Sequence, residues 1–275
     1  MTDRYAVIGN PVAHSKSPEI HAAFARATGE EVEYDRLLSP IGSFASIVGH
    51  FRRLGGKGLN VTVPFKQEAF RLADSLSGRA STAQAVNTLR FDGDRAYGDN
   101  TDGEGLVRDI TRNLGVKLAG KRVLVLGAGG AAQGVIGPLQ QQGPASLLVA
   151  NRDPAKAEAL AARFGGKVRA ASYLSLAHGQ FEVVVNATSA SLTGELPPIP
   201  KGIFSKEALA YDMVYGRGDT PFLGRARAEG AGVLADGLGM LVEQAAESFF
   251  VWRGVRPDTE AVLAALRDSA SVKRL

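Results

Sequence analysis

The chain has 275 residues, 45% of them hydrophobic and 22% charged, with a formal net charge of +4 at pH 7. These proportions are typical of a globular protein, and a chain of this length usually folds into two domains. The absence of cysteine excludes disulfides, thiolate metal ligands and cysteine nucleophiles.

The excess of positive charge does not indicate a nucleic-acid partner. The basic residues are scattered, and the densest group (Arg52, Arg53 and Lys57) is interrupted by leucine and glycine. No zinc-finger, RNP or basic-helix signature is present. A mild positive charge also suits a protein that handles small anions. Because no apolar run approaches the ~18 residues that span a bilayer, we expect neither a nucleic-acid nor a membrane partner.

The N-terminal residues lead directly into a strand pattern, without the apolar stretch of a signal peptide, which favours a cytoplasmic location. The histidines lack the spacing of metal ligands, so we expect no metal site. We expect each of them to be a surface or loop residue: His14, His21, His50 and His178.

Strand-like and helix-like segments alternate through the first hundred residues. We expect strands at 5–9, 33–38 and 58–63, and helices at about 18–28 and 43–54. This alternation predicts a mostly parallel sheet covered by helices. Ligands of such sheets bind beyond the carboxyl ends of the strands, so polar residues there are candidates for a site.

The first candidate cluster follows the first strand. Ser17 and Pro18 predict a helix start, with Ser17 as the N-cap and proline at the first helical position. The hydroxyls of Ser15 and Ser17, beside free backbone N–H groups, could bind a carboxylate. Taken alone, the pattern is equally consistent with a simple N-cap and a loop serine.

The second cluster surrounds the third strand. Period-two alternation places Asn60 and Thr62 on one face, and Lys66 follows beyond the carboxyl end. Farther along, Asn87 and Asp102 are each more often turn or cap residues when taken singly. Chemistry gives a reason to group them, because a Lys66–Asp102 pair could donate a proton to a bound oxygen or accept one from it.

A second alternation begins near residue 106. Strands are expected at 122–126, 146–150, 182–186, 209–213 and 232–235, with helices at 154–164 and 221–229. Its first strand runs into Gly127-x-Gly129-x-x-Ala132, and a helical pattern follows. Gly127 allows the tight turn, and Gly129 lets a phosphate approach the backbone closely. Ala132 allows the helix to pack closely on the strand. The segment therefore predicts a doubly wound dinucleotide domain with pyrophosphate at a helix N-terminus.

The next strand end indicates which dinucleotide binds. Arg152, with Lys156 one helical turn later, suits a ribose phosphate and therefore NADP. Asp153 complicates this interpretation, because an acid there could repel the phosphate or pair with the ribose. Alternatively, Arg152 and Lys156 are solvated charges at a helix start. Two further helical patterns, at about 238–252 and 258–268, end the chain and could cap either domain.

Taken together, these motifs resemble the shikimate dehydrogenase family over nearly the whole chain. The matching segments are 15–18, 60–66, 85–88, 98–103, 127–131, 151–152, 186–189, 211–215 and 236–244. The resemblance implies NADPH-dependent reduction of 3-dehydroshikimate to shikimate, in the pathway to chorismate and the aromatic amino acids. It implies an α/β fold of two domains, in a monomer or homodimer with the active site in the cleft. Residues 1–103 and 238–275 would form the substrate domain, completed by the C-terminal helices, and 104–237 a Rossmann-type NADP domain.

Carried over by position, the resemblance makes Lys66 the acid/base catalyst, with Asp102 beside it. The residues implied for the substrate are Ser15, Ser17, Asn60, Thr62, Asn87, Asp102, Tyr215 and Gln244. Those implied for NADP are Gly127, Ala128, Gly129, Gly130, Ala131, Asn151, Arg152, Asp153, Lys156, Thr188, Met213 and Gly237. Met240 and Gln244 are four residues apart and share a helix face, which would let the helix after Gly237 reach the substrate.

Two positions depart from the family pattern. The cofactor loop of the family usually reads Asn-Arg-Thr/Ser followed by a further Arg, whereas this chain has Asp153 and Lys156. Family members often carry an acid twelve residues past the lysine, where this chain has Gly78. The alternatives are a quinate/shikimate dehydrogenase that also uses NAD, and a non-catalytic NADP-binding regulator. Retention of both Lys66 and Asp102 argues against the regulator.

Overall fold

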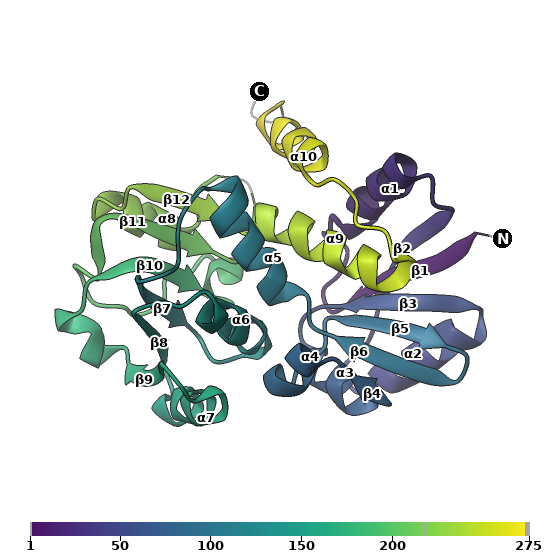
Figure 1. Ribbon diagram of the computed structural model, residues 1–275, viewed down its shortest axis with the longest axis horizontal. Coiled ribbons are helices and arrows are strands. Elements are labelled where there is room, and N and C mark those ends of the chain that lie inside the picture. The colour runs from purple at the N-terminus through teal and green to yellow at the C-terminus, as the bar shows by residue number, and fades with distance from the viewer. Residues whose placement is uncertain (1, 217, 273–275) are drawn as a thin grey trace. The chain divides into compact units, whose positions relative to one another are not determined.

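The computed structural model describes residues 2–216 and 218–272, except for the side chains of His178 and residues 269–272. The chain divides into two compact units, which Figure 1 shows in a single view. Unit 1 comprises Met1–Gly105 and Leu241–Leu275, and unit 2 comprises Leu106–Met240. Residues 273–275, included in the expected substrate domain, lie outside the described residues. No helix in the described ranges is long and apolar enough to cross a membrane.

The sheet of unit 1 has six strands in the order β2-β1-β3-β5-β6-β4. Their bounds are β1 Asp3–Gly9, β2 Val32–Leu38, β3 Gly56–Val61, β4 Ser75–Leu76, β5 Thr88–Asp92 and β6 Arg95–Asp99. Strands β1, β2 and β3 are parallel, as expected, but β5 is antiparallel to both β3 and β6. The sheet is therefore mixed, because the unexpected β5–β6 hairpin is inserted beside β3. Since β6 again runs parallel to β3, the carboxyl ends of β1, β3 and β6 lie at one edge.

The two faces of this sheet are covered by different helices. The helices of the unit are α1 Ser17–Thr28, α2 Phe44–Arg53, α3 Lys66–Leu72, α4 Gly78–Ala83, α9 Leu238–Arg253 and α10 Glu260–Val272, of which α9 begins in unit 2. Leu59 and Val61 face an apolar core that includes residues of α2, α3 and α4. Asn60, between them, faces the opposite side, where α1 and α9 supply its neighbours. On that side Trp252 stacks on Tyr5, with ring centroids 4.5 Å apart.

The sheet of unit 2 is entirely parallel, in the order β12-β11-β10-β7-β8-β9. Its strands are β7 Arg122–Leu126, β8 Ser146–Asn151, β9 Val168–Ser172, β10 Phe181–Asn186, β11 Phe204–Asp212 and β12 Val233–Asp236. Numbered within the unit, the order is 3-2-1-4-5-6 read from the β9 edge, which is the strand order of a doubly wound dinucleotide fold. The order reverses between β7 and β10, so the switch point lies where the glycine motif follows β7.

Alternate residues of β7 pack into two separate cores, which is what a sheet covered on both faces requires. The elements around the sheet are α5 Asp102–Arg108, a π-helical turn Asp109–Asn113, α6 Gly130–Gln141, α7 Pro154–Phe164, α8 Pro221–Ala228 and two 3-10 turns, Leu174–His178 and Ala190–Thr193. Val123 and Val125 share a core with residues of α5, α6 and α7. Leu124 and Leu126 share the other core with residues of α8.

Candidate active site

The predicted acid/base pair is formed in unit 1. Lys66 is the first residue of α3, just after β3, and Asp102 is the first residue of α5, just after β6. Because both strands end at the same edge of the sheet, the two side chains meet, with Lys66 Nζ 2.5 Å from Asp102 Oδ2. The side chains are only 14% and 6% exposed. A shielded ammonium held by a carboxylate is an arrangement that can deliver a proton to a bound oxygen.

Asn87 holds the second carboxylate oxygen of this pair. Its Nδ2 donates to Asp102 Oδ1 at 2.9 Å and lies 3.2 Å from Gln244 Oε1. Its Oδ1 accepts the backbone N–H of Thr101 at 2.8 Å. Three residues predicted from different parts of the sequence, Asn87, Asp102 and Gln244, are thus brought together with Lys66.

The serines after β1 lie side by side, but Ser17 is not the expected helix cap. Ser17 is wrongly predicted as the N-cap, since the cap position of α1 is Lys16 and no side chain caps the helix. Ser17 is instead inside the first turn, with Pro18 after it. Its hydroxyl makes no capping bond to the helix backbone. It accepts a hydrogen bond from Ser15 Oγ at 3.1 Å and contacts the phenol of Tyr34. Both hydroxyls therefore remain side by side at the helix start.

Thr62 lies just beyond β3, which ends at Val61 rather than at residue 63. The chain turns there because the N–H of Phe65 donates to the Thr62 carbonyl at 3.0 Å. The Thr62 methyl packs on Gly9, where an added Cβ would lie 2.4 Å from Thr62 Cγ2. Glycine at the end of β1 therefore makes room for Thr62 beside the serine loop.

Asn60 is the centre of a buried polar network that the sequence patterns did not indicate. Its Oδ1 accepts from Tyr34 Oη at 2.7 Å and lies 3.2 Å from His21 Nε2. Its Nδ2 donates to Ser248 Oγ at 2.9 Å. His21 was expected at the surface or in a loop, which is wrong: it is fully buried in α1. The signal that could have found it is its place on the apolar face of that helix, one residue after Ile20 and three before Phe24.

A second buried cluster supports the loop that carries Asp102. The Arg79 guanidinium donates to both oxygens of Asp99, each at 2.7 Å, and Ser77 donates to the same carboxylate at 2.5 Å. Burial acts to raise the pKa of the Asp99 carboxyl. The hydrogen bonds and the positive charge of Arg79 act in the opposite direction, as do the hydrogen bonds from Ser77 and the Asn100 backbone, and together they leave the pKa below its usual value. The adjacent Gly78, where the family often has an acid, faces open space.

The glycine motif of unit 2 forms the expected turn. Gly127 follows β7 with a φ of +108°, and an added Cβ would lie 3.1 Å from the Ala187 carbonyl oxygen. Gly129 is the N-cap position of α6, with no side-chain cap and no acidic residue in the first turn. The helix start therefore presents backbone N–H groups without a competing carboxylate. The remaining members of the motif, Ala128, Gly130 and Ala131, lie within the same turn and helix start.

The loop after β8 places its charges at the surface. Arg152, Asp153 and Lys156 are exposed. Asp153 is the N-cap of α7, where its Oδ1 accepts the N–H of Ala155 at 3.1 Å, and Asn151 Nδ2 donates to the Asp153 carbonyl at 3.0 Å. Asp153 thus caps the helix, a role that serine performs about equally well.

A buried carboxylate, Asp212 at the end of β11, connects two loops of unit 2. It accepts from Ser191 Oγ and Thr220 Oγ1, both at 2.6 Å, and from Asn186 Nδ2 at 3.2 Å. The segments it fixes include the predicted cofactor residues Thr188 and Met213. Gly237 lies against Met213, since an added Cβ would be 2.2 Å from the Met213 carbonyl oxygen. Tyr215, two residues after Met213, is half-buried in this unit.

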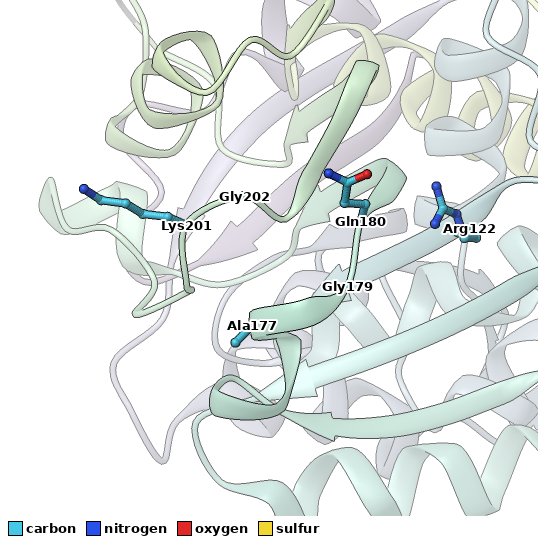
Figure 2. A pocket seen from close by; sticks show the side chains of 6 residues that line it. All are labelled: Arg122, Ala177, Gly179, Gln180, Lys201 and Gly202. Atoms are coloured by element: carbon cyan, nitrogen blue, oxygen red, sulfur yellow. The ribbon is translucent and has the colours of Figure 1, made fainter.

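A surface hollow elsewhere in unit 2 takes no part in these arrangements. It is lined by Arg122, Ala177, Gly179, Gln180, Lys201 and Gly202. Arg122 begins β7 and Gln180 precedes β10, so the hollow is at the amino ends of these strands, away from the glycine motif. Figure 2 shows that the long side chains around it do not converge on one point. Among the described residues, no group of three or more metal-binding side chains is placed to hold an ion.

Comparison with known proteins gives this geometry its context. Residues 7–89 match the shikimate dehydrogenase substrate binding domain, 109–193 the shikimate / quinate 5-dehydrogenase domain, and 237–267 the shikimate 5'-dehydrogenase C-terminal domain. A shikimate dehydrogenase (NADP(+)) of Chromobacterium violaceum is 59% identical over 270 residues, covering 98% of this chain and 99% of the relative. The chain belongs to the shikimate dehydrogenase family.

Solved structures that are similar to this chain share its fold. The Ael1 enzyme from Pseudomonas putida is 52% identical, with a TM-score of 0.91 over 96% of this chain and 98% of that one. The shikimate 5-dehydrogenase from Thermus thermophilus, solved in complex with NADP(H) and shikimate, is 35% identical, with a TM-score of 0.87 over 97% and 99% of the two chains. The expected fold, two α/β domains of which one is Rossmann-type, is thereby confirmed.

Proposed function

We propose that this chain catalyses the reversible NADPH-dependent reduction of 3-dehydroshikimate to shikimate, in the pathway to chorismate and the aromatic amino acids. The observation that carries the proposal is the shielded Lys66–Asp102 pair, held by Asn87 at the edge where β1, β3 and β6 end. A family member that bound the dinucleotide without catalysis would have no use for a buried, oriented acid/base pair. This argues against the regulator considered above.

In the proposed reaction, Lys66 moves the proton. Its ammonium donates to the ketone oxygen as hydride reaches the carbonyl carbon, and in the reverse direction its amine accepts the hydroxyl proton. Asp102 holds the ammonium in place and accepts a hydrogen bond from a neighbouring ring hydroxyl. Because the pair is shielded from water, the charge that develops on the oxygen interacts strongly with the ammonium.

The remaining polar residues bind the substrate. The paired hydroxyls of Ser15 and Ser17 donate to the substrate carboxylate, and Tyr215 contributes a third hydroxyl. Asn60, Thr62, Asn87 and Gln244 surround the ring hydroxyls. A polyol of this size requires donors and acceptors at fixed positions, and a misplaced or missing partner is costly when the site is buried.

NADPH supplies the hydride, and unit 2 has the features to bind it. Residues 127–131 receive the pyrophosphate, since the turn is open at Gly129 and the start of α6 carries no acid. The side chains of Arg152 and Lys156 receive the ribose phosphate, with Asn151 and Asp153 beside them. Thr188, Met213 and Gly237 border the nicotinamide. The substrate-binding domain then corresponds to 1–103 with 238–275, and the NADP domain to 104–237.

The proposal includes a cytoplasmic protein that acts as a monomer or homodimer on small molecules. A second candidate function is a quinate/shikimate dehydrogenase that also uses NAD. One observation favours it: Asp153 places a carboxylate at the exposed start of α7, where an NAD-binding protein carries an acid for the ribose hydroxyls.

The test is an absorbance assay at the reduced-nicotinamide band, with shikimate or quinate and NADP or NAD in all four combinations. Turnover only with shikimate and NADP, abolished by Lys66→Ala, is the expected result. Comparable turnover with quinate or NAD would favour the broader enzyme. An absence of turnover in all four would reject the catalytic assignment.

A further inference from the structure

His21 is held in an environment with no charged group. Its ring is fully buried and stacks on Tyr34 of β2, with centroids 4.2 Å apart and planes 7° apart. Phe24 of the same helix, and Phe249 and Trp252 of α9, complete the surroundings, with ring centroids 5.3 to 6.2 Å away. Its Nδ1 has no hydrogen-bond partner among the described residues. A polar side chain buried in this way needs a reason to be there.

The contacts of Asn60 determine which way its amide group points. One end of the amide lies 3.4 Å from the Asn87 carbonyl oxygen, which can only accept, so this end must be the NH₂ group. The opposite end is therefore the oxygen, which faces Tyr34 and His21. Since that oxygen can only accept, both neighbours must donate to it.

This orientation also determines the state of the imidazole. Nε2 carries the hydrogen that is donated to Asn60, so in the neutral ring Nδ1 carries no hydrogen and is an acceptor. A charged ring would carry a second, unpartnered N–H in an apolar surrounding. Burial accordingly lowers the pKa of His21 to about 3, although the hydrogen bond to Asn60 acts in the opposite direction. His21 therefore remains a neutral donor with a single tautomer at physiological pH.

The network continues to the serines after β1. The phenol hydrogen of Tyr34 is directed to Asn60 at 2.7 Å, which leaves the phenol oxygen as an acceptor beside Ser17. Ser15 donates in turn to Ser17 at 3.1 Å. The Ser17 hydrogen thus rests on a neutral oxygen, a weaker partner than a carboxylate, and can turn to a carboxylate when one binds.

We propose that His21 is a positioning residue for the substrate carboxylate, acting through Asn60 and Tyr34 on the Ser15–Ser17 pair. Its N–H and the Tyr34 hydroxyl share one acceptor, so each holds the amide orientation that the other requires. Without the His21 donor, the Asn60 amide and the Tyr34 hydroxyl lose their fixed directions, and Ser17 loses its oriented neighbour. The inference rests on the proposed binding of the carboxylate at Ser15 and Ser17.

The test compares two substitutions of the same residue. His21→Phe keeps a planar ring for stacking on Tyr34 but removes the N–H, and His21→Gln supplies an amide N–H without the ring. We expect His21→Phe to raise the KM for shikimate about tenfold, the effect of one lost hydrogen bond, with kcat and the KM for NADP within about twofold of the parent. His21→Gln should recover most of the shikimate KM. His50→Phe, at an exposed position of α2, is the matched control.

A second arm uses shikimate with its carboxylate replaced by a carboxamide. The parent enzyme should have a much lower KM for shikimate than for the carboxamide. His21→Phe should reduce the ratio of these two KM values. The proposal is overturned if His21→Phe retains the parent KM, if His21→Gln is impaired as much as His21→Phe, or if the KM for NADP changes in step. A loss in His21→Gln together with the parent KM in His21→Phe would assign His21 to packing alone.

If His21→Phe does not fold, Tyr34→Phe provides the same test, because it removes only the hydroxyl and keeps the stacked ring. It should raise the shikimate KM by a similar factor, and an unchanged KM would overturn the proposal. Failure of the proposed function is distinguishable from failure of this inference: the first is an absence of turnover in the parent enzyme. Calorimetric titration with shikimate would still separate the His21 variants in that case.

Discussion

The two candidate sites, one in each unit, are built from different parts of the chain. In unit 1 the candidate site consists of buried side chains that hold one another: Asn87 is 2% exposed and Asp102 5%. In unit 2 the proposed pyrophosphate site is a backbone turn, and the charges of the 151–156 loop are exposed. A small polyol offers few contacts, so each donor and acceptor must be fixed, whereas a dinucleotide can be bound by helix-start N–H groups and surface cations.

This difference predicts which kinds of substitution matter in each unit. Conservative side-chain changes should have large effects in unit 1, because the polar atoms of residues such as Asn87 and Asp102 are shielded and hydrogen-bonded. In unit 2, the sensitive positions should be those where a side chain is added to the backbone.

The largest effect is expected at Asp102. Asp102→Asn keeps the shape of the side chain but removes the charge that holds Lys66, and we expect kcat to fall about 10²- to 10³-fold, the range of acid/base catalysis. Glu104→Gln is the control and should stay near the parent value, because Glu104 lies in the same first turn of α5 but pairs with Arg79 and not with Lys66. Steady-state rates with shikimate and NADP measure kcat for both variants. A fall in kcat of less than threefold in Asp102→Asn would contradict its assigned role in holding Lys66.

The next effect concerns acid stability. The unfolded chain protonates His21 near pH 6.5, whereas the folded chain resists protonation until about pH 3. Between these values the unfolded state binds more protons, so the free energy of unfolding falls as the pH falls, by at most about 1.4 kcal/mol per pH unit. By pH 5 this amounts to about 2 kcal/mol. Urea unfolding of the parent and of His21→Phe at pH 7 and pH 5 measures this loss of the free energy of unfolding. An equal pH dependence in the parent and the variant would count against a buried neutral imidazole.

Gly127 tests the backbone side of the comparison. Gly127→Ala places a Cβ at a φ of +108° and 3.1 Å from a carbonyl oxygen, which should cost about 1 to 2 kcal/mol of stability and weaken NADP binding. Gly129→Ala has open space for its Cβ and should weaken NADP binding without lowering the melting temperature. Calorimetric titration and thermal melts separate the two, and normal NADP affinity in both variants would refute the predicted pyrophosphate site.

The smallest effect is expected at Asp153. Asp153→Ser keeps an N-cap for α7 and removes an exposed negative charge, so the KM for NADP should fall about two- to fivefold while the KM for NAD rises. Glu158→Gln removes a charge from the same helix and controls for net charge. An unchanged ratio of the two KM values would show that Asp153 does not affect the choice of cofactor.

The sequence predicted the parts of the fold whose signals are local. Alternating apolar strands and the glycine motif identified unit 2, and α7 has the bounds expected from its helical pattern, 154–164. Strand β9 was missed because Val168–Ser172 contains two alanines and an arginine, which give no strand pattern. The β5–β6 hairpin was missed because Arg95–Asp99 is similarly poor in apolar residues, and its pairing with β5 is what makes it a strand.

The candidate residues were predicted by type and by their place at strand ends, but their partners were not. Lys66 and Asp102 were paired by chemical reasoning and by family resemblance, since they are 36 residues apart. The apolar face of α1 indicates that His21 is buried, but only the fold brings it to Tyr34, Asn60 and α9. Ser17 was misplaced by one position because a serine before proline usually marks an N-cap, whereas here the helix starts one residue earlier.

The division of unit 1 into two distant stretches of chain has a consequence for biosynthesis. Asn60 pairs with Ser248, 188 residues later, and Arg253 bonds both Asp3 and Glu30. Unit 2 lies between them as one uninterrupted stretch, Leu106–Met240. A nascent chain can therefore complete the dinucleotide fold of unit 2 before α9, which packs on the earlier strands of unit 1, has been synthesised. Ribosome stalling or truncation before Ser248 would release a protein with an intact second unit and an open polar network around Asn60.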